Sequence, residues 1–228
     1  GDPDLELALN AINLTWPVNN VTVLEFDFVA ESETMAFNYV FGSDEYLTWI
    51  NSEYNDVFGF FISGPGISGP YASPSSFPDG SINIANVPNS TPSLPITISS
   101  VNNLLNSQYY IDNQSTFPQT ISCNGFTTSF TATTLVQCGE IYHIRLALAD
   151  GSDANLDSWV FLEAGSFSSN GSVSVSGTYS HTTCNSYTWI DGNTYTSSTN
   201  TPTYTLTNAA GCDSVVTLNL TVNSVNNS

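Results

Sequence analysis

Hydrophobic and polar residues alternate along many short segments of this chain. In 21–29, Phe26 and Phe28 occupy one face of an extended backbone, while Glu25 and Asp27 occupy the other. A period of two is typical of a strand with one buried face. The segments of the first region that we expect to form strands are 21–29, 34–41, 57–62, 82–87, 94–99, 126–136, 141–149 and 158–163.

Some segments depart from this alternation. The run 57–62 is apolar on both faces, so it predicts a central strand of a sandwich, and a Gly-Pro-Gly turn at 64–66 ends it. Residues 66–95 are rich in Pro, Ser and Gly and predict a long surface excursion. The segment 5–13 is the only one that favours a short helix.

The composition changes at 166–173, which is rich in Ser, Gly and Asn. Beyond it, acidic residues are almost absent and Thr, Tyr, Ser and Val alternate. The dipeptide Asp191-Gly192 is typical of a hairpin turn. The expected strands of this second region are 173–180, 186–190, 194–196, 202–207 and 214–222.

We therefore expect an all-β chain with two domains. Residues 1–168 are predicted to form a β-sandwich that is jelly-roll-like and has long loops. Residues 169–172 are a linker, 173–223 a small β-repeat or immunoglobulin-like domain, and 224–228 a tail. About fifty residues make a small core, so a disulfide staple would have a physical purpose in the second domain.

The four cysteines allow three pairings. We expect the local pairs Cys123–Cys138 and Cys184–Cys212, because each pair falls within one predicted domain. Disulfides would place the protein in an oxidising, extracellular environment. The alternative is four free, buried thiols.

The charge balance excludes several classes of partner. The chain has one basic residue, Arg145, against twenty Asp and Glu, and its formal net charge is −19. It cannot neutralise a run of phosphates, which argues against nucleic acid as a partner, and it has no direct attraction to anionic lipid headgroups. No apolar run approaches the roughly 20 residues of a membrane helix, so no direct membrane insertion is expected. The carboxylates favour hard cations such as Ca²⁺.

The densest acidic segment is 150–157, with Asp150, Asp153, Asn155 and Asp157. Oxygen-bearing side chains at every second position of a turn can converge on one cation, as in the related spacing of EF-hand loops. The glycine and glutamate that mark an EF-hand are absent. We expect Ca²⁺ here; the alternative is an acidic, solvated loop between two strands.

A second acidic group stands at the ends of two predicted strands. It consists of Asp44, Glu45, Asn55 and Asp56. These residues could share a cation with 150–157 or hold one of their own. The alternative is ordinary turn formation, which Asp and Asn favour.

Signals for catalysis are weak. Asp44 with Glu45, or Asp150 with Asp157, could act as a glycosidase pair, but a chance pair is expected among twenty acids. His143 lies within a predicted strand and is expected to be packed, and no G-x-S-x-G nucleophile motif is present. We therefore expect no enzyme and no catalytic residues.

The sole arginine and the loop aromatics have structural interpretations. Arg145 is expected to pair with a carboxylate of a neighbouring strand, Glu163 or Glu25, because a buried charge needs a partner. The loop aromatics form either a sugar-binding surface or satellite core packing, and we favour packing. They are Tyr46, Trp49, Tyr54, Tyr71, Tyr109 and Tyr110.

Several strings together resemble the choice-of-anchor L domain over about 1–168. They are YVFGSDEY (39–46), NDVFGFFISGPG (55–66), INIANVPN (82–89) and YHIRLALADGSDANLDSWVFLEAGSF (142–167). The second region resembles a short Cys-containing β-repeat of the same proteins, through CNSYTWIDGNTYT (184–196) and GCDSVVTLNLTV (211–222). The resemblance implies a secreted surface protein, mainly of Bacteroidota and often exported by type IX secretion. Family members usually carry a glycine-rich stretch before the GDPDL motif, so we expect a part of a larger protein.

These observations predict a non-catalytic module at the bacterial cell surface, an adhesin or a surface-filament component, in which Ca²⁺ stabilises acidic loops. The expected partner is an extracellular protein or glycan, or a neighbouring subunit. The alternatives are a carbohydrate-binding, lectin-like module and a self-assembling sheath or fibre subunit.

Overall fold

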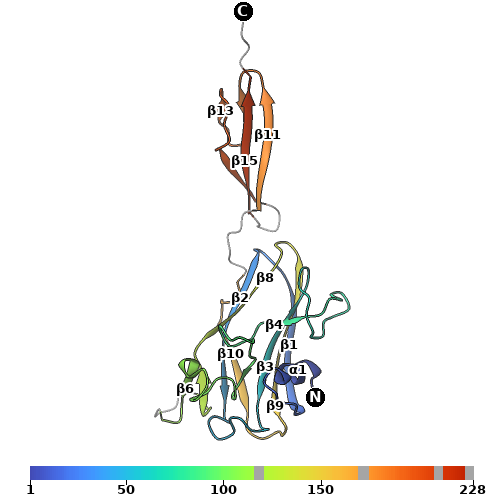
Figure 1. Cartoon of the computed structure of the whole chain (residues 1–228), viewed down its shortest axis with the longest axis vertical. Helices are drawn as coiled ribbons and strands as arrows, with labels where there is room; N and C mark the ends of the chain where they lie inside the picture. Colours follow the sequence, from blue (N-terminus) through green and yellow to red (C-terminus); the bar gives the residue numbers. More distant parts are fainter. Residues whose placement is uncertain (116–120, 169–174, 208–212, 224–228) are drawn as a thin grey trace, which may run out of the picture.

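The computed structural model describes residues 1–115, 121–168, 175–207 and 213–223, and these are almost entirely β-structure (Figure 1). The predicted linker and tail lie outside these residues. Within the described part of the chain, no helix is long and apolar enough to cross a membrane.

Two antiparallel sheets form the first domain. The strands of the first sheet are β1 (Val18–Val29), β3 (Val57–Ser63), β4 (Ile82–Asn83), β5 (Ile96–Thr97) and β9 (Ile141–Gly151). Those of the second sheet are β2 (Thr34–Ser43), β6 (Tyr110–Asp112), β7 (Gly125–Thr127), β8 (Phe130–Leu135) and β10 (Ser158–Leu162). Their orders are β1-β9-β3-β4, with β5 also on β3, and β10-β2-β7-β6, with β8 also on β2. The all-β class is confirmed, while the jelly-roll topology is not.

Aromatic side chains fill the space between the two sheets. The rings of Phe37 and Phe60 lie 5.7 Å apart, and those of Tyr39 and Phe58 lie 5.2 Å apart, so each pair joins β2 to β3. Such pairs stabilise a core beyond the area they bury. Every residue of β3 is buried, as the uninterrupted apolar run predicts for a central strand.

The helix α1 (Pro3–Asn10) covers the outer face of the first sheet. Its cap is Asp2, whose carboxylate accepts hydrogen bonds from two backbone N–H groups of the first turn, at 3.0 and 3.1 Å. Leu5 and Leu9 are buried against β3 and β9. The helix begins earlier than the predicted 5–13, because an Asp cap followed by proline starts it.

The strand predictions differ from the structure mainly at short elements. The predicted strand 126–136 is divided into β7 and β8, which pair with successive parts of β2. The strand β6, which follows a 3-10 helix (Ser107–Tyr109), was not predicted, because no alternation marks its three residues.

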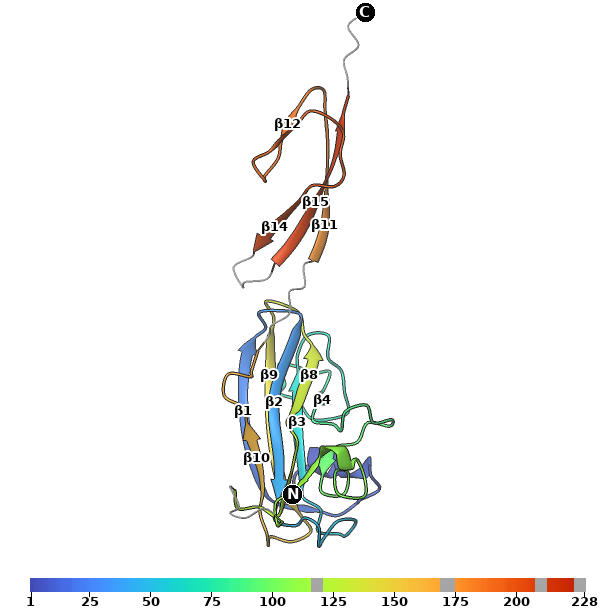
Figure 2. The same ribbon diagram turned by 90° about the vertical axis from the view of Figure 1, so that its left-hand side faces the viewer.

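The second domain is small and consists of a three-stranded and a two-stranded sheet. Its strands are β11 (Val175–Thr183), β12 (Tyr187–Thr188), β13 (Thr194–Tyr195), β14 (Thr203–Thr207) and β15 (Asp213–Val222). β15 lies between β14, which is antiparallel to it, and β11, which is parallel to it (Figure 2). The predicted turn at Asp191-Gly192 joins β12 to β13, with Gly192 at φ +82°. The buried core contains Trp189, Leu218 and Leu220.

Neither predicted local disulfide is formed. Cys123 is a free, buried thiol and Cys184 is a free, exposed one. Cys138 is disulfide-bonded. Cys212 lies outside the described residues.

The fold explains why Cys123 and Cys138 do not pair. The residue after Cys123 donates its backbone N–H to Ser43 at the end of β2, at 3.2 Å. The residue after Cys138 donates to Ala30, just before β2, at 2.7 Å. A strand rises about 3.3 Å per residue, so the ten residues of β2 separate the two cysteines by about 30 Å, far beyond the roughly 7 Å between Cα atoms that a disulfide allows.

The two free thiols should differ in reactivity. We expect a maleimide to label Cys184 in the native protein and Cys123 only after denaturation, because burial and the nearby Asp44 charge raise the pKa of Cys123 to about 11. Intact mass spectrometry before and after guanidinium treatment would count the labels, and Cys184→Ser should remove the fast one. Absence of a Cys123 label in the denatured, unreduced protein would contradict the free thiol.

Candidate functional site

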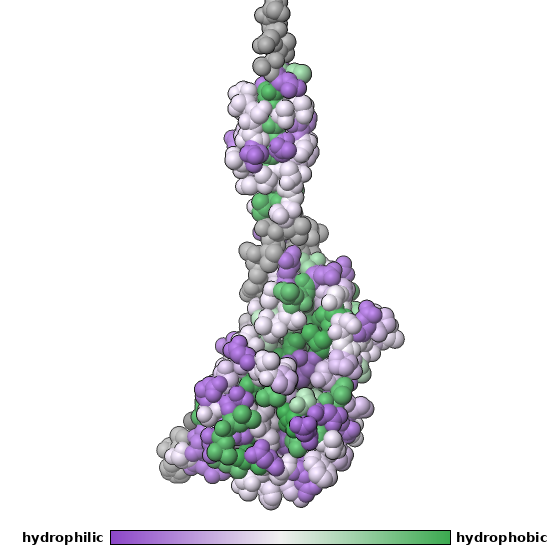
Figure 3. Space-filling model, viewed as in Figure 1, coloured by the Kyte–Doolittle hydropathy of each residue, from purple (hydrophilic) through white to green (hydrophobic). Residues whose placement is uncertain are grey.

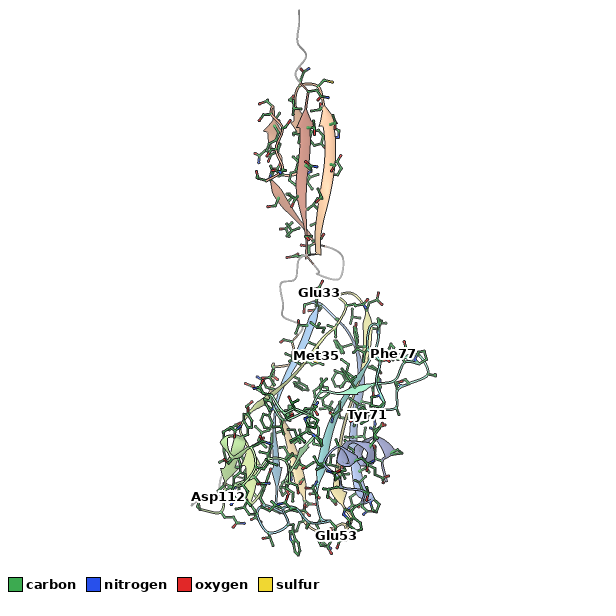
Figure 4. All side chains as sticks on the ribbon, in the orientation of Figure 1. Glu33, Met35, Glu53, Tyr71, Phe77 and Asp112 are labelled. Carbon is green, nitrogen blue, oxygen red and sulfur yellow. The ribbon has the colours of Figure 1, made fainter. Side chains whose placement is uncertain are left out.

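Three turns meet at one end of the first domain and bring the two predicted acidic groups together. They are the turn after β2, the segment before β3, and the turn between β9 and β10. Glu53 marks this end in Figure 4, opposite Glu33. We call the predicted residues there the acidic loop cluster: Asp44, Glu45, Asn55, Asp56, Asp150, Asp153, Asn155 and Asp157.

Backbone contacts hold the three turns together. The N–H of Asp44 donates to the carbonyl of Asp157 at 3.0 Å, and the N–H of Gly151 donates to the Asp56 carboxylate at 3.1 Å. A Cβ at Gly151 would lie 2.6 Å from the backbone N and O of Asn55. Only glycine therefore permits this close approach of β9 to the segment before β3.

Glu45 and Asp56 form the buried centre of the cluster. Their exposed fractions are 1% and 0%, and the N–H of Asp56 donates to Glu45 Oε2 at 3.3 Å. Burial, together with the Asp56 charge, raises the pKa of Glu45 to about 9. Burial also raises the pKa of Asp56 to about 6, although a hydrogen bond from the Ser158 hydroxyl at 2.6 Å opposes this. The larger rise falls on Glu45, so burial favours a proton on Glu45 over one on Asp56.

Further carboxylates surround this pair. Burial raises the pKa of Asp150, and a 3.0 Å hydrogen bond from the Asn20 side chain partly offsets the effect. Burial and the charge of Asp157 raise the pKa of Asp44. The cluster thus concentrates negative charge that no nearby cation in the described structure compensates.

The predicted ligands do not form a finished metal site. The Asp153 carboxylate accepts hydrogen bonds from the backbone and side-chain nitrogens of Asn155, at 3.2 and 3.0 Å, within an exposed turn. Among the described residues, no group of three or more His, Cys, Asp or Glu side chains is arranged to hold a metal ion. The two acidic groups, which could have formed one shared cation site or two separate sites, therefore lie next to each other. Their oxygens do not converge on one point.

The sole arginine lies away from this cluster, on the outer face of the first sheet. Its Nε is 3.3 Å from Glu25 and its Nη1 is 3.4 Å from Asp4, while Nη2 contacts Asp2. The expected partner Glu25 is confirmed; Glu163 instead accepts from an asparagine side chain at 2.8 Å. Asp2 and Asp4 were not predicted as partners, although Asp-Pro at a helix start is a signal that could have placed them.

Most loop aromatics pack, as expected. Tyr46, Tyr71, Tyr109 and Tyr110 each have a ring neighbour within 5.2 Å. Trp49 and Tyr54 contact each other with ring centroids 5.1 Å apart, and 38% of Trp49 is exposed. This pair is the aromatic surface that the loops present.

Stability should fall as pH rises. A carboxyl whose pKa is higher in the folded chain takes up a proton on folding, so its contribution is fully present below its ordinary pKa of 4.5 and is lost towards about 9. In EDTA we expect the melting temperature to drop by several degrees between pH 5 and 9. In Glu45→Gln, which cannot ionise, the drop should be smaller; calorimetry would measure both.

Glu53→Gln provides the matched control, since Glu53 is exposed in the same loop. It should retain the pH dependence of the original protein. An equal melting temperature across this pH range, or the same slope in Glu45→Gln, would contradict the buried, protonated Glu45.

Comparison with known proteins identifies the family of the first domain. The model of the choice-of-anchor L domain matches residues 1–168, well over half of the chain. No match was found among curated proteins or among solved structures. The motifs at the ends of β2, β3 and β9, which build the acidic loop cluster, all lie within the matched residues. The chain belongs to the choice-of-anchor L domain family.

Proposed function

We propose that this chain is a non-catalytic module of a secreted Bacteroidota surface protein, an adhesin or a surface-filament component, and that its acidic loop cluster binds Ca²⁺. Family membership indicates a surface-associated protein. The observation that carries the proposal is the convergence of three acidic turns at one end of the sandwich, while the only Lys or Arg of the chain is engaged elsewhere.

A divalent cation would act on the turns that the cluster joins. Burial favours a proton on Glu45, and Ca²⁺ would displace this proton because metal ligands must be deprotonated. The carboxylates of Asp153, which is half-buried, and of Asp157, which is exposed, can rotate towards the ion. Bound Ca²⁺ would then cancel the repulsion and fix the turns against each other.

The remaining surface suits a protein or glycan partner. Figure 3 shows several hydrophobic patches on the first domain, whereas the second domain is largely neutral or hydrophilic on this face. Exposed apolar side chains of the first domain include Ile111 and Phe161, at 38% and 41%. Apolar patches rimmed by polar residues are typical of binding surfaces. The Trp49–Tyr54 pair is the feature that favours a glycan.

Calcium should raise thermal stability. Ligand at about 100 times its dissociation constant stabilises by about 2.7 kcal/mol, which corresponds to roughly 5–10 °C for a protein of this size. We expect a rise of this order on changing from EDTA to millimolar Ca²⁺ at pH 8, and a smaller rise at pH 6, where protons compete. Scanning calorimetry would measure both.

Two variants test whether the Ca²⁺-dependent rise in melting temperature comes from the acidic loop cluster. Asp150→Asn should reduce the Ca²⁺-dependent rise, and Glu33→Gln, at the opposite end of the sandwich, should leave it unchanged. Identical melting temperatures with EDTA and with Ca²⁺ would reject the cation proposal for all eight predicted ligands.

Self-assembly into a fibre is the second candidate, and one observation favours it. The edge strands β1 and β10 border an apolar cavity of about 200 Å³. Leu24 and Leu162 line this cavity and are 50% and 37% exposed. Phe167 closes another part of the gap by packing on Phe26 and Phe28. A strand of a second copy could pair with either open edge and fill the cavity.

Sedimentation velocity would test assembly. We expect concentration-dependent association of the original protein and loss of it in Leu24→Lys, which places a charge in the cavity. Leu135→Lys makes the same change at a residue that is 77% exposed on β8, and it should still associate. A monomer at all concentrations would reject assembly through this edge.

A further inference from the structure

A second site, separate from the acidic loop cluster, lies on the outer face of the first sheet. A cavity of about 370 Å³ opens between the start of α1, the 72–74 loop and strands β1, β9 and β3. Its volume is within the range of small-molecule sites. Strand register sets two rows of side chains on this face, Glu25–Arg145–Phe61 and Asp27–His143–Ser63, and all of them except Asp27 line the cavity.

The carboxylates around Arg145 give the cavity an excess of negative charge. The guanidinium of Arg145 is held by Asp2, Asp4 and Glu25, so three carboxylates surround one cation. The N–H groups of Arg145 are thereby engaged, and an anionic ligand would meet two uncompensated charges. Electrostatics therefore favours a ligand that is cationic.

The second row supplies hydrogen-bond acceptors. His143 Nδ1 lies 2.8 Å from Asp27 Oδ1, and in the neutral ring this contact places the proton on Nδ1. In that tautomer His143 Nε2 is an acceptor, and it lies 3.9 Å from Glu25 Oε1. Two of the cavity's side chains thus present acceptor atoms close together.

Ser63 provides the independent sign of a missing ligand. The residue is 1% exposed and lines the cavity, yet its Oγ has no hydrogen-bond partner. Leaving a buried hydroxyl unpaired costs about 1–3 kcal/mol, so such a group in a cavity points to something that binds there. Ser63 is the registered neighbour of His143, and such pairs have Cβ atoms about 4.5–5.5 Å apart.

We propose that this cavity binds a primary ammonium group. Its charge matches the carboxylate excess, and three lining residues offer acceptors for its N–H donors: Glu25, His143 and Ser63. A sugar ring is less well matched, because the Phe61 face is 1% exposed and lies under Arg145, 5.6 Å from the ring centroid. The inference goes beyond the proposed function and does not depend on Ca²⁺.

A primary ammonium group could come from a lysine side chain of a protein partner or from an amino sugar. NMR titrations of the full chain with n-butylamine and with glucosamine, in EDTA, would separate these sources, and n-butanol and glucose are the neutral controls. We expect saturable shifts of the His143 imidazole signals with at least one amine, at roughly millimolar affinity, and none with the neutral controls. Binding of n-butylamine alone would indicate a lysine-bearing partner.

Variants distinguish the cavity from general attraction to an acidic surface. Glu25→Gln and Ser63→Ala should each weaken amine binding by about fivefold or more, since each removes one acceptor or charge. Glu140→Gln removes an exposed carboxylate from the turn before β9 and should not change binding. Absence of saturable binding, or equal affinities in all variants, would overturn the proposal, and neither result would bear on the calcium experiment.

Discussion

The ion cluster around Arg145 is the constraint on which the outer face of the first domain depends. One guanidinium joins the start of α1, through Asp2 and Asp4, to β1 through Glu25. The same Asp2 carboxylate caps the helix, so helix initiation and docking use one side chain. Because the chain has no second Lys or Arg, the remaining carboxylates must be solvated, protonated or matched by outside cations. The acidic loop cluster is where the excess of carboxylates over positive charges is greatest.

Much of the fold follows from local sequence patterns. Alternation located the long strands, and the continuous apolar run identified β3 as central, because these signals depend only on which faces are buried. Leu24 shows the limit of the pattern. It belongs to the apolar face of β1, yet it is 50% exposed because the sandwich is open at that edge. The cysteine pairing was wrong because closeness in sequence does not determine which end of β2 a residue occupies.

The sequence predicted which residues take part in the acidic loop cluster, but it did not predict how they are arranged. The two acidic groups at strand ends were predicted to form one shared cation site or two separate ones, and the structure brings them to one edge of the sandwich. The sequence could not predict that Glu45 and Asp56 would be buried as a pair or that their oxygens would fail to converge with the exposed ones. The cavity beside Arg145 was missed entirely. Ser63 and His143 are eighty positions apart, and only strand register makes them neighbours.

The parallel pairing of β11 with β15 has a mechanical consequence. These strands are the first and last of the second domain, they run in the same direction, and nine residue pairs connect them. The chain therefore enters at one end of the ladder and leaves at the other. A tensile force applied through the chain pulls the two strands past each other and loads all their hydrogen bonds at once, in shear. An antiparallel arrangement of the terminal strands would open one bond at a time, so the parallel pairing resists extension of the chain better than that arrangement would.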